Sequence, residues 1–281
     1  MTTARTDRPS DQQQLWQLVE LWHATARDAV ALLRSLAPEE WELPTDLPGW
    51  DVRAVASHLA HLESELAGNP QEQVEVGEAP HAKGLMGQFT EAGCVARRPW
   101  STERIVEELE ASVATRYDAL LAEPPTDASA PGPGFAGAIG WSWQTLLTNR
   151  PLDLWMHEQD IRRATGRPGG LDSPGAAHVA DVFSRSLPFV LGKKVGAPAG
   201  TTVVLDVEGH QPRTMAATVG DDGRGAPLPD PPVSPDARVV LQFEDWTVLA
   251  GGRRTADTVD ARVEGDEELG RKVLASLAVT P

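Results

Sequence analysis

The chain has 281 residues, of which 41% are hydrophobic and 23% charged, so it is long enough for one large or two smaller packed domains. Its formal net charge of -16 repels phosphate backbones and anionic lipid, which makes nucleic acids and membrane surfaces poor partners. No segment approaches the roughly 20 apolar residues that span a bilayer, and the polar first residues lack the apolar core of a secretion signal. We therefore expect a cytoplasmic protein.

Four segments of the N-terminal half carry apolar residues at helical spacing. The helices predicted from them cover residues 11–36, 51–66, 101–122 and 151–166. Asp51 and Ser101 are placed to cap the second and third helices, because their side-chain oxygens can accept hydrogen bonds from free first-turn amides. Pro151 suits the first turn of the fourth helix, and Gly166 can end it. Four helices of these lengths predict an N-terminal bundle from about residue 8 to residue 168.

Two long connections separate these helices. Residues 69–100 are rich in Gly, Pro and Glu, and we expect a loop with one short helix around residues 84–92. Residues 123–140 are rich in Pro, Gly and Ala and are expected to form a second loop.

The pattern changes after residue 170. A helix is predicted over residues 173–190, and short β-branched or alternating runs then predict strands. The predicted strands cover residues 201–207, 213–219, 238–243 and 261–263, with helices at 244–250 and 267–277 and a proline-rich surface loop at 226–235. Residues 171–281 therefore form a smaller α/β domain, and the predicted fold class is α+β.

The single cysteine, Cys94, rules out an intramolecular disulfide and a metal site built from several cysteines. A catalytic nucleophile would need an activating neighbour, and no histidine lies close to Cys94 in the sequence. We interpret it as a small buried or loop residue.

One helical arc in the fourth helix gathers groups that can ligate a metal. Asp153 and His157 are one turn apart, and Asp160 lies on the same arc of the helix. Burying an unpaired carboxylate is costly, so a carboxylate that points into the bundle needs a cation or hydrogen-bond donors beside it. In the second helix, His58 lies at the edge of the apolar stripe and can reach the bundle interior. His61 is expected to be rotated further outward and is the weaker candidate.

Two imidazoles and one carboxylate with a fourth position open are the ligand set of a catalytic zinc, since structural zinc sites use four protein ligands. The candidate ligands are His58, Asp153 and His157. Spacing alone leaves an alternative open, because Asp-x-x-x-His also occurs as a buried, hydrogen-bonded pair without a metal.

Two segments of the N-terminal half carry a family resemblance. The segments LPGWDVRAVASHLA (residues 47–60) and DLWMHEQDIRRATGRPG (residues 153–169) resemble, in order and separation, the mycothiol-dependent maleylpyruvate isomerase family of DinB-like metalloproteins. The segments FEDWTVLAGGR (243–253) and VEGDEELG (263–270) resemble the sterol-carrier-like second domain of that family. The resemblance thus implies a DinB-like four-helix bundle over 8–168 and a sterol-carrier-like domain over 171–281.

The resemblance also implies residue roles. The metal ligands of the family correspond to His58, Asp153 and His157, and the position of Asp153 is often Glu in such proteins. A catalytic arginine of the second domain corresponds to Arg253, with Arg254 as its neighbour. An arginine exposed after the Gly251-Gly252 turn is the alternative interpretation.

The chemistry implied is zinc-dependent, or uses another divalent metal, with mycothiol as cosubstrate. Metal-bound thiolate would attack a small electrophile, and the reaction would end either as cis-trans isomerisation with return of the thiol or as thiol S-transfer. Two other classes remain open. A metal-activated water would make the protein a hydrolase, and loss of catalysis would leave a metal- or ligand-binding regulatory protein.

Overall fold

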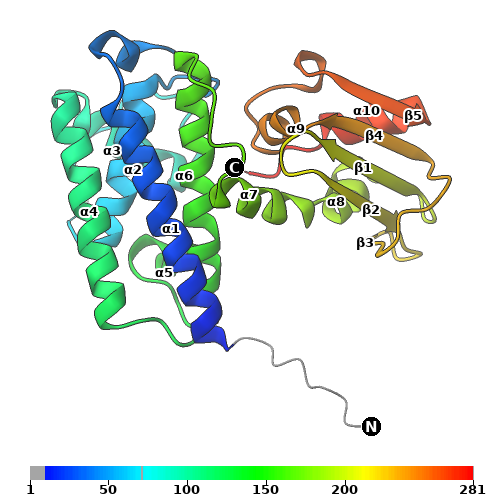
Figure 1. The fold of residues 1–281 in the computed structure, drawn as a ribbon, viewed down its shortest axis with the longest axis horizontal. Coiled ribbons are helices and arrows are strands. Elements are labelled where there is room, and N and C mark those ends of the chain that lie inside the picture. Colours follow the sequence, from blue (N-terminus) through cyan, green and yellow to red (C-terminus); the bar gives the residue numbers. More distant parts are fainter. Residues whose placement is uncertain (1–9, 71, 281) are drawn as a thin grey trace. The chain divides into compact units, whose positions relative to one another are not determined.

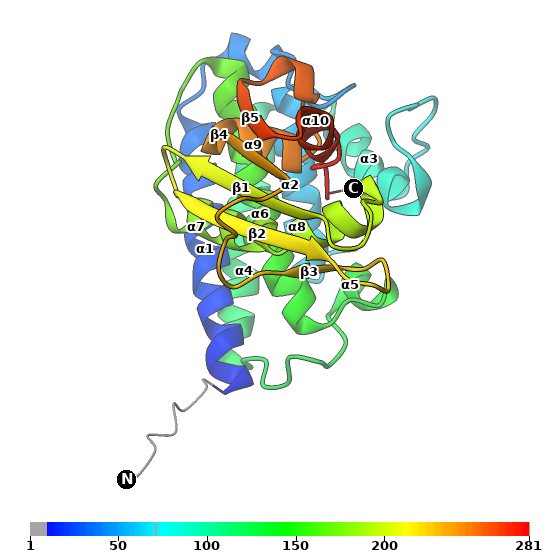
Figure 2. The same ribbon diagram turned by 90° about the vertical axis from the view of Figure 1, so that its right-hand side faces the viewer.

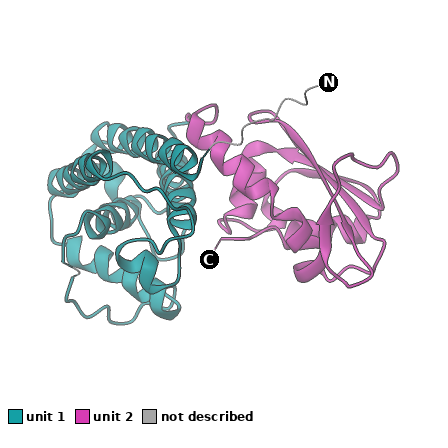
Figure 3. Ribbon diagram, turned by 90° about the horizontal axis from the view of Figure 1, so that it is seen from below, with its two compact units in different colours: residues 1–168 teal, residues 169–281 magenta. Residues whose placement is uncertain are grey.

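The computed structural model is helical up to about residue 195, and all strands among its described residues lie after residue 200. It describes residues 10–70 and 72–280 and divides the chain into two compact units, residues 1–168 and 169–281 (Figure 3). The first unit is helical and the second contains a five-stranded sheet, which confirms the α+β class. Residues 8, 9 and 281, at the edges of the two predicted domains, lie outside the described residues.

The first unit contains four long helices and several shorter ones (Figure 1). The elements are α1 (Asp11–Arg34), the 3₁₀ helix η1 (Pro38–Glu42), α2 (Val52–Leu66), α3 (Gly84–Arg97), α4 (Thr102–Ala122), α5 (Gly134–Ala138) and α6 (Trp143–Thr165). Helix α1 packs against α6 and α4, and α2 packs against α4, α3 and α6. The predicted caps are confirmed, because Asp51 accepts from the amide of Ala54 and Ser101 from that of Arg104.

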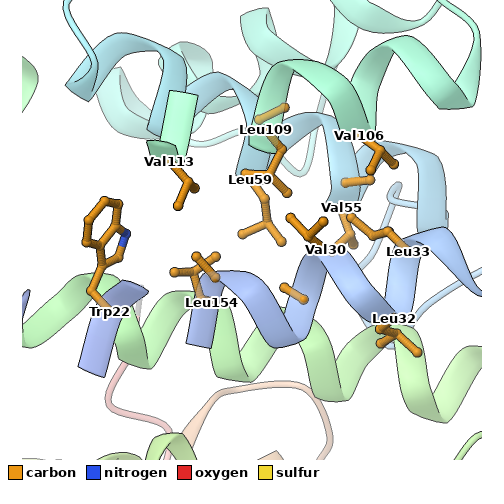
Figure 4. Close-up of a cluster of buried hydrophobic side chains, with 14 of the residues drawn as sticks. Trp22, Val30, Leu32, Leu33, Val55, Leu59, Val106, Leu109, Val113 and Leu154 are labelled. Atoms are coloured by element: carbon orange, nitrogen blue, oxygen red, sulfur yellow. The ribbon is translucent and has the colours of Figure 1, made fainter. Parts of the chain in front are cut away.

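The bundle core is formed by the apolar stripes of the four long helices. Figure 4 shows side chains of α1, α2, α4 and α6 converging, among them Trp22, Leu59, Leu109 and Leu154. These four side chains are fully buried, and burying one such large apolar group contributes about 1.5–3 kcal/mol. The core fixes the rotation of each helix, and therefore the direction in which the polar residues of α2 and α6 point.

The predicted start of the fourth helix is wrong. Helix α6 begins at Trp143, and Pro151 lies inside it. Ser142 caps the helix by accepting from the amide of Thr145, and the preceding loop satisfies the first amides because Trp143 and Gln144 donate to its carbonyls. These bonds start the helix two turns early and offset the hydrogen bond that Pro151 cannot make.

The two predicted loops contain more helix than expected. Helix α3 runs to Arg97 rather than ending near residue 92, because its last turn buries Arg97 against two carboxylates, Glu72 and Glu108. The five-residue helix α5 lies in the segment 123–140 that we expected to be a loop throughout.

The second unit is a mixed sheet with helices. Its elements are α7 (Pro174–Ser184), α8 (Leu187–Phe189), the π-helix η2 (Val190–Val195), β1 (Thr202–Glu208), β2 (Arg213–Val219), β3 (Gly225–Pro227), β4 (Ala237–Gln242), α9 (Phe243–Ala250), the 3₁₀ helix η3 (Ala256–Thr258), β5 (Ala261–Gly265) and α10 (Glu267–Ala275). The predicted single helix over 173–190 is instead broken after Ser184, where Ser184 and Ser186 turn their hydroxyls onto the carbonyls of Ala180 and Phe183. The predicted loop 226–235 begins with the short edge strand β3.

The strand order is β3-β2-β1-β4-β5, with β1 parallel to β4 and every other pair antiparallel (Figure 2). Helix α8 packs against β2 and β3, α9 against β1 and β4, and α10 against β4 and β5. The central strands β1 and β4 are largely buried, and Leu205 of β1 lies beside its register partner Val239 of β4. Among the described residues, no helix is long and apolar enough to cross a membrane.

Candidate metal centre

Three candidate ligands from two helices meet in the interior of the first unit. His58 lies in the middle of α2, and Asp153 and His157 lie on consecutive turns of α6. One ligand atom from each residue can be chosen so that all three atoms lie within 4.8 Å of one another. The two imidazoles are buried, and the side chain of Asp153 keeps 21% of its surface exposed. The sequence-predicted set is therefore brought together, with its open side at Asp153.

The spacing of these donors fits a divalent cation. Nε2 of His58 lies 3.4 Å from Oδ2 of Asp153, and Nε2 of His157 lies 3.5 Å from Oδ1 of Asp153. Ligand atoms around a tetrahedral zinc at about 2.1 Å are about 3.4 Å apart. Both distances exceed those of charge-assisted hydrogen bonds. Neither ring nitrogen of the buried His58 has a hydrogen-bond partner among the described residues, which is costly unless something else binds there. The donor set of two imidazoles and one carboxylate suits zinc.

A carboxylate fixes the orientation of His157. Its Nδ1 lies 3.0 Å from Oδ2 of Asp160, a residue with no exposed surface. The other oxygen of Asp160 accepts from Arg163, and a carboxylate paired in this way with a guanidinium acts as an acceptor toward the imidazole. The hydrogen of the neutral imidazole therefore sits on Nδ1, and the lone pair of Nε2 points toward Asp153 and His58.

Asp153 is held by an arginine of its own helix. Nη1 of Arg150 donates to Oδ2 of Asp153 at 2.9 Å. Burial alone raises the pKa of Asp153, but the charges of Arg150 and His157 outweigh it and hold the pKa well below its usual range. Asp153 is therefore an anion at neutral pH.

The two histidines differ in basicity. Burial lowers the pKa of His58 to about 4, with Asp153 opposing the shift. Burial also lowers the pKa of His157, but Asp153 and Asp160 together raise it above the usual value. His58 is thus neutral at neutral pH, whereas His157 would have to give up a proton for a cation to bind its nitrogen.

An aromatic wall stands beside the imidazoles. The ring centroid of Trp50 lies 5.0 Å from that of His58 and 6.0 Å from that of His157. Its indole N–H donates to the buried carboxylate of Glu91 at 2.8 Å, and Nε2 of His81 lies 2.9 Å from the same oxygen. This hydrogen bond fixes the indole beside the two imidazoles.

Other sequence-predicted residues lie elsewhere. His61 is buried rather than turned outward, and its Nδ1 lies 2.6 Å from Oε2 of Glu72. Cys94 is buried as expected, and its Sγ–H donates to the carbonyl of Ala54. Arg253 follows α9 in the second unit, is partly buried, and donates from Nη1 to the carbonyl of Gly251 at 2.6 Å. Its catalytic role stays a prediction.

Sequence reasoning missed Arg150, Glu63 and Trp50. The spacing of Arg150 and Asp153, three apart on a helix, is a signal that could have found their contact. Assigning Pro151 to the first turn hid it, because that placed Arg150 before the helix. Glu63 and Trp50 gave no comparable signal, since the hydrogen-bond partners of their side chains are 41 or more residues away in the chain.

The fold and the ligand cluster define an α+β protein whose helical unit carries a His-Asp-His group suited to a divalent metal. Two family models then match the chain, the mycothiol maleylpyruvate isomerase N-terminal domain over residues 22–162 and the C-terminal domain of the same proteins over residues 177–271. The chain therefore belongs to the mycothiol maleylpyruvate isomerase family, which confirms the resemblance.

Solved structures support the same fold. A crystal structure of a mycothiol-dependent maleylpyruvate isomerase is 19% identical, with a TM-score of 0.52 over 93% of this chain and 95% of that chain. A histidine-to-alanine mutant of such an isomerase is also 19% identical, with a TM-score of 0.51 and the same coverage. At this identity the likeness concerns the fold. No curated protein matched the sequence.

Proposed function

We propose that His58, Asp153 and His157 hold a divalent metal, most readily zinc, and that the protein is an enzyme that uses mycothiol to attack a small electrophile. The observation that carries this proposal is the cluster itself, three donors at zinc-like spacing with one buried imidazole whose ring nitrogens make no hydrogen bond among the described residues. Membership of the family supports mycothiol as the thiol and a maleylpyruvate-like compound as the electrophile. The outcome is a cis-trans isomerisation or an S-transfer.

The chain's residues then have distinct tasks. The metal, when bound, supplies Lewis-acid stabilisation that lowers the pKa of a coordinated thiol. Asp153 contributes the negative charge of the ligand set, and Asp160 holds the N–H of His157 so that Nε2 faces inward. Trp50 and the surrounding core exclude water from the two imidazoles, which strengthens electrostatic interactions at the site.

The reacting sulfur comes from the cosubstrate in this proposal. Cys94 is the only cysteine of the chain, it is buried, and burial raises the pKa of its thiol. A protonated and inaccessible thiol is a poor nucleophile. For the electrophile we propose Arg253 as the residue that binds a carboxylate, since a guanidinium can donate two parallel hydrogen bonds to it.

Metal analysis and a thiol-dependent assay test this function together. Purified protein should contain about one zinc per chain, and a His58→Ala, His157→Ala double variant should contain none. Activity toward a maleylpyruvate-like electrophile should need both mycothiol and metal, and a chelator should abolish it. Full metal occupancy in the double variant would refute the site.

The same assay separates the alternatives. An isomerase returns the thiol unchanged, whereas an S-transferase consumes one thiol for each product, so thiol titration during turnover distinguishes the two. Hydrolysis that needs metal but no thiol would indicate a hydrolase. Metal binding without turnover of any electrophile would indicate a regulatory or ligand-binding protein.

A further inference from the structure

A glutamate lies in the centre of the helical bundle, away from the candidate ligands. Glu63 on α2 has no exposed surface, and an unpaired carboxylate there would be strongly destabilising. It accepts from Nε1 of Trp22 on α1 at 3.0 Å and from Nη1 of Arg116 on α4 at 2.8 Å. It also accepts from Arg150 on α6, so that all four long helices contribute to this group.

Arg150 connects Glu63 to the candidate metal centre. Its side chain is buried, and it divides its donors between two carboxylates. Nε and Nη2 donate to Oε1 of Glu63 at 3.0 and 2.9 Å, and Nη1 donates to Oδ2 of Asp153 at 2.9 Å. Arg150 thus connects Glu63 in the bundle core to Asp153, a candidate ligand, through hydrogen bonds.

A guanidinium on a metal ligand competes with the metal. Both are cations that attract the carboxylate of Asp153, and a buried pair is poorly screened. The carboxylate of Glu63, on the other side of Arg150, reduces this competition, because its negative charge offsets the positive charge of the guanidinium. Burial raises the pKa of Glu63, but Arg150 and Arg116 outweigh burial and lower it, so Glu63 is charged at neutral pH.

We infer that Glu63 is a positioning residue of the metal centre, which acts through Arg150 to keep Asp153 available to a divalent cation. The inference rests on the proposed function, because it takes His58, Asp153 and His157 as the ligands. Glu63 touches neither metal nor substrate. Its effect is on how strongly Asp153 donates, and therefore on the affinity of the site.

Glu63→Gln tests this role, because the amide preserves the shape of the side chain and removes its charge. Arg150 then has Asp153 as its single carboxylate partner among these contacts, and zinc must displace a stronger ion pair. We expect the dissociation constant for zinc, measured by competition with a chromophoric chelator at pH 7, to rise at least 10-fold. An unchanged constant would overturn the inference.

Trp22→Phe is the matched control. It removes one hydrogen bond to the same oxygen of Glu63 and disturbs the same core, but it leaves the charge of Glu63 in place. We expect a lower melting temperature with zinc affinity within about 2-fold of the wild type. Loss of affinity equal to that of Glu63→Gln would show that Glu63 acts only through general stability, and would also overturn the inference.

A further pair of variants keeps the test decisive if Glu63→Gln does not fold. With Arg150→Gln as background, adding Glu63→Gln should change zinc affinity less than 3-fold, because the connecting arginine is gone. A 10-fold loss in that background would show that Glu63 does not act through Arg150. The wild-type measurement separates this inference from the proposed function. A wild type that binds no zinc refutes both. A wild type that binds zinc with the same affinity as Glu63→Gln refutes only the inference.

Discussion

Asp160 binds the nitrogen of His157 that faces away from the other candidate ligands, with 3.0 Å between Oδ2 and Nδ1. The two residues are three apart on α6, so the contact is built into one helix and does not depend on tertiary packing. Such a carboxylate fixes the tautomer and the ring orientation of a ligating histidine and makes the ligating nitrogen more basic.

Asp160→Asn should therefore weaken zinc binding by about 10- to 100-fold, the range found when a partner of a ligating histidine is removed. The amide keeps the size of the side chain but loses its charge, so Nε2 of His157 becomes a weaker donor. Chelator competition measures the change. Asp172→Asn is a suitable control, because Asp172 also accepts from a histidine, His210, but at an exposed position of the second unit. Equal affinities for the two variants would contradict the assignment of His157 as a ligand.

The sequence predicted the elements that local chemistry determines. Helices α2 and α4 begin where Asp51 and Ser101 supply caps, and α6 ends at Gly166, which adopts a left-handed conformation that favours glycine. The candidate ligands could be found because Asp153 and His157 share one helical face and because the surrounding segments resemble a family.

Long-range contacts explain what the sequence did not predict. The early start of α6 depends on carbonyls of Ala128 and Ala130, which a local pattern does not reveal. The charge of Glu63 is tolerated only because Trp22, Arg116 and Arg150 converge from three other helices. Periodicity identifies apolar faces, whereas a buried charged group is defined by partners distant in sequence.

Glu72→Gln should reduce stability at neutral pH and have less effect in acid. Burial raises the pKa of Glu72, but contacts with His61 and Arg97 outweigh it and lower the pKa to about 2. Since the ordinary value is 4.5, the ionised form stabilises the fold above pH 4.5, and this contribution is lost as the pH falls from about 4.5 toward 2. Urea unfolding at a series of pH values measures the difference between wild type and variant.

Glu75→Gln is the control for that series. Glu75 lies in the same connection between α2 and α3, is exposed, and gives the same change in net charge. Its stability difference from the wild type should stay near zero at every pH. A Glu72→Gln difference that stays constant from pH 7 to pH 3 would show that the loss is one of packing and not of charge.

Cys94 should be inert toward thiol reagents in the folded protein. Its sulfur is buried, donates to the carbonyl of Ala54, and has a pKa raised by burial. Aromatic disulfide reagents should modify it in urea but not under native conditions. Cys94→Ser preserves a donor for the same carbonyl and should keep zinc content and turnover within a few fold. Loss of turnover with metal retained would indicate that the protein supplies its own thiolate.

Arg253→Ala should lower kcat/KM at least 30-fold without changing zinc content. The reason is chemical, because a carboxylate electrophile that approaches a chain with a net charge of -16 needs a local cation to bind it. Removing a charged hydrogen bond at the reacting centre costs about 2 kcal/mol or more, which corresponds to that fold-change. Arg253→Lys should recover only part of the loss, since an ammonium does not form the two parallel bonds of a guanidinium.

Arg254→Ala, a change at the exposed neighbouring position, is the matched control and should retain most of the activity. If the loss appears in Arg254→Ala instead, the carboxylate is bound one residue further along the chain. If both alanine variants keep full kcat/KM, neither arginine binds the electrophile, and the contribution of the second unit is structural.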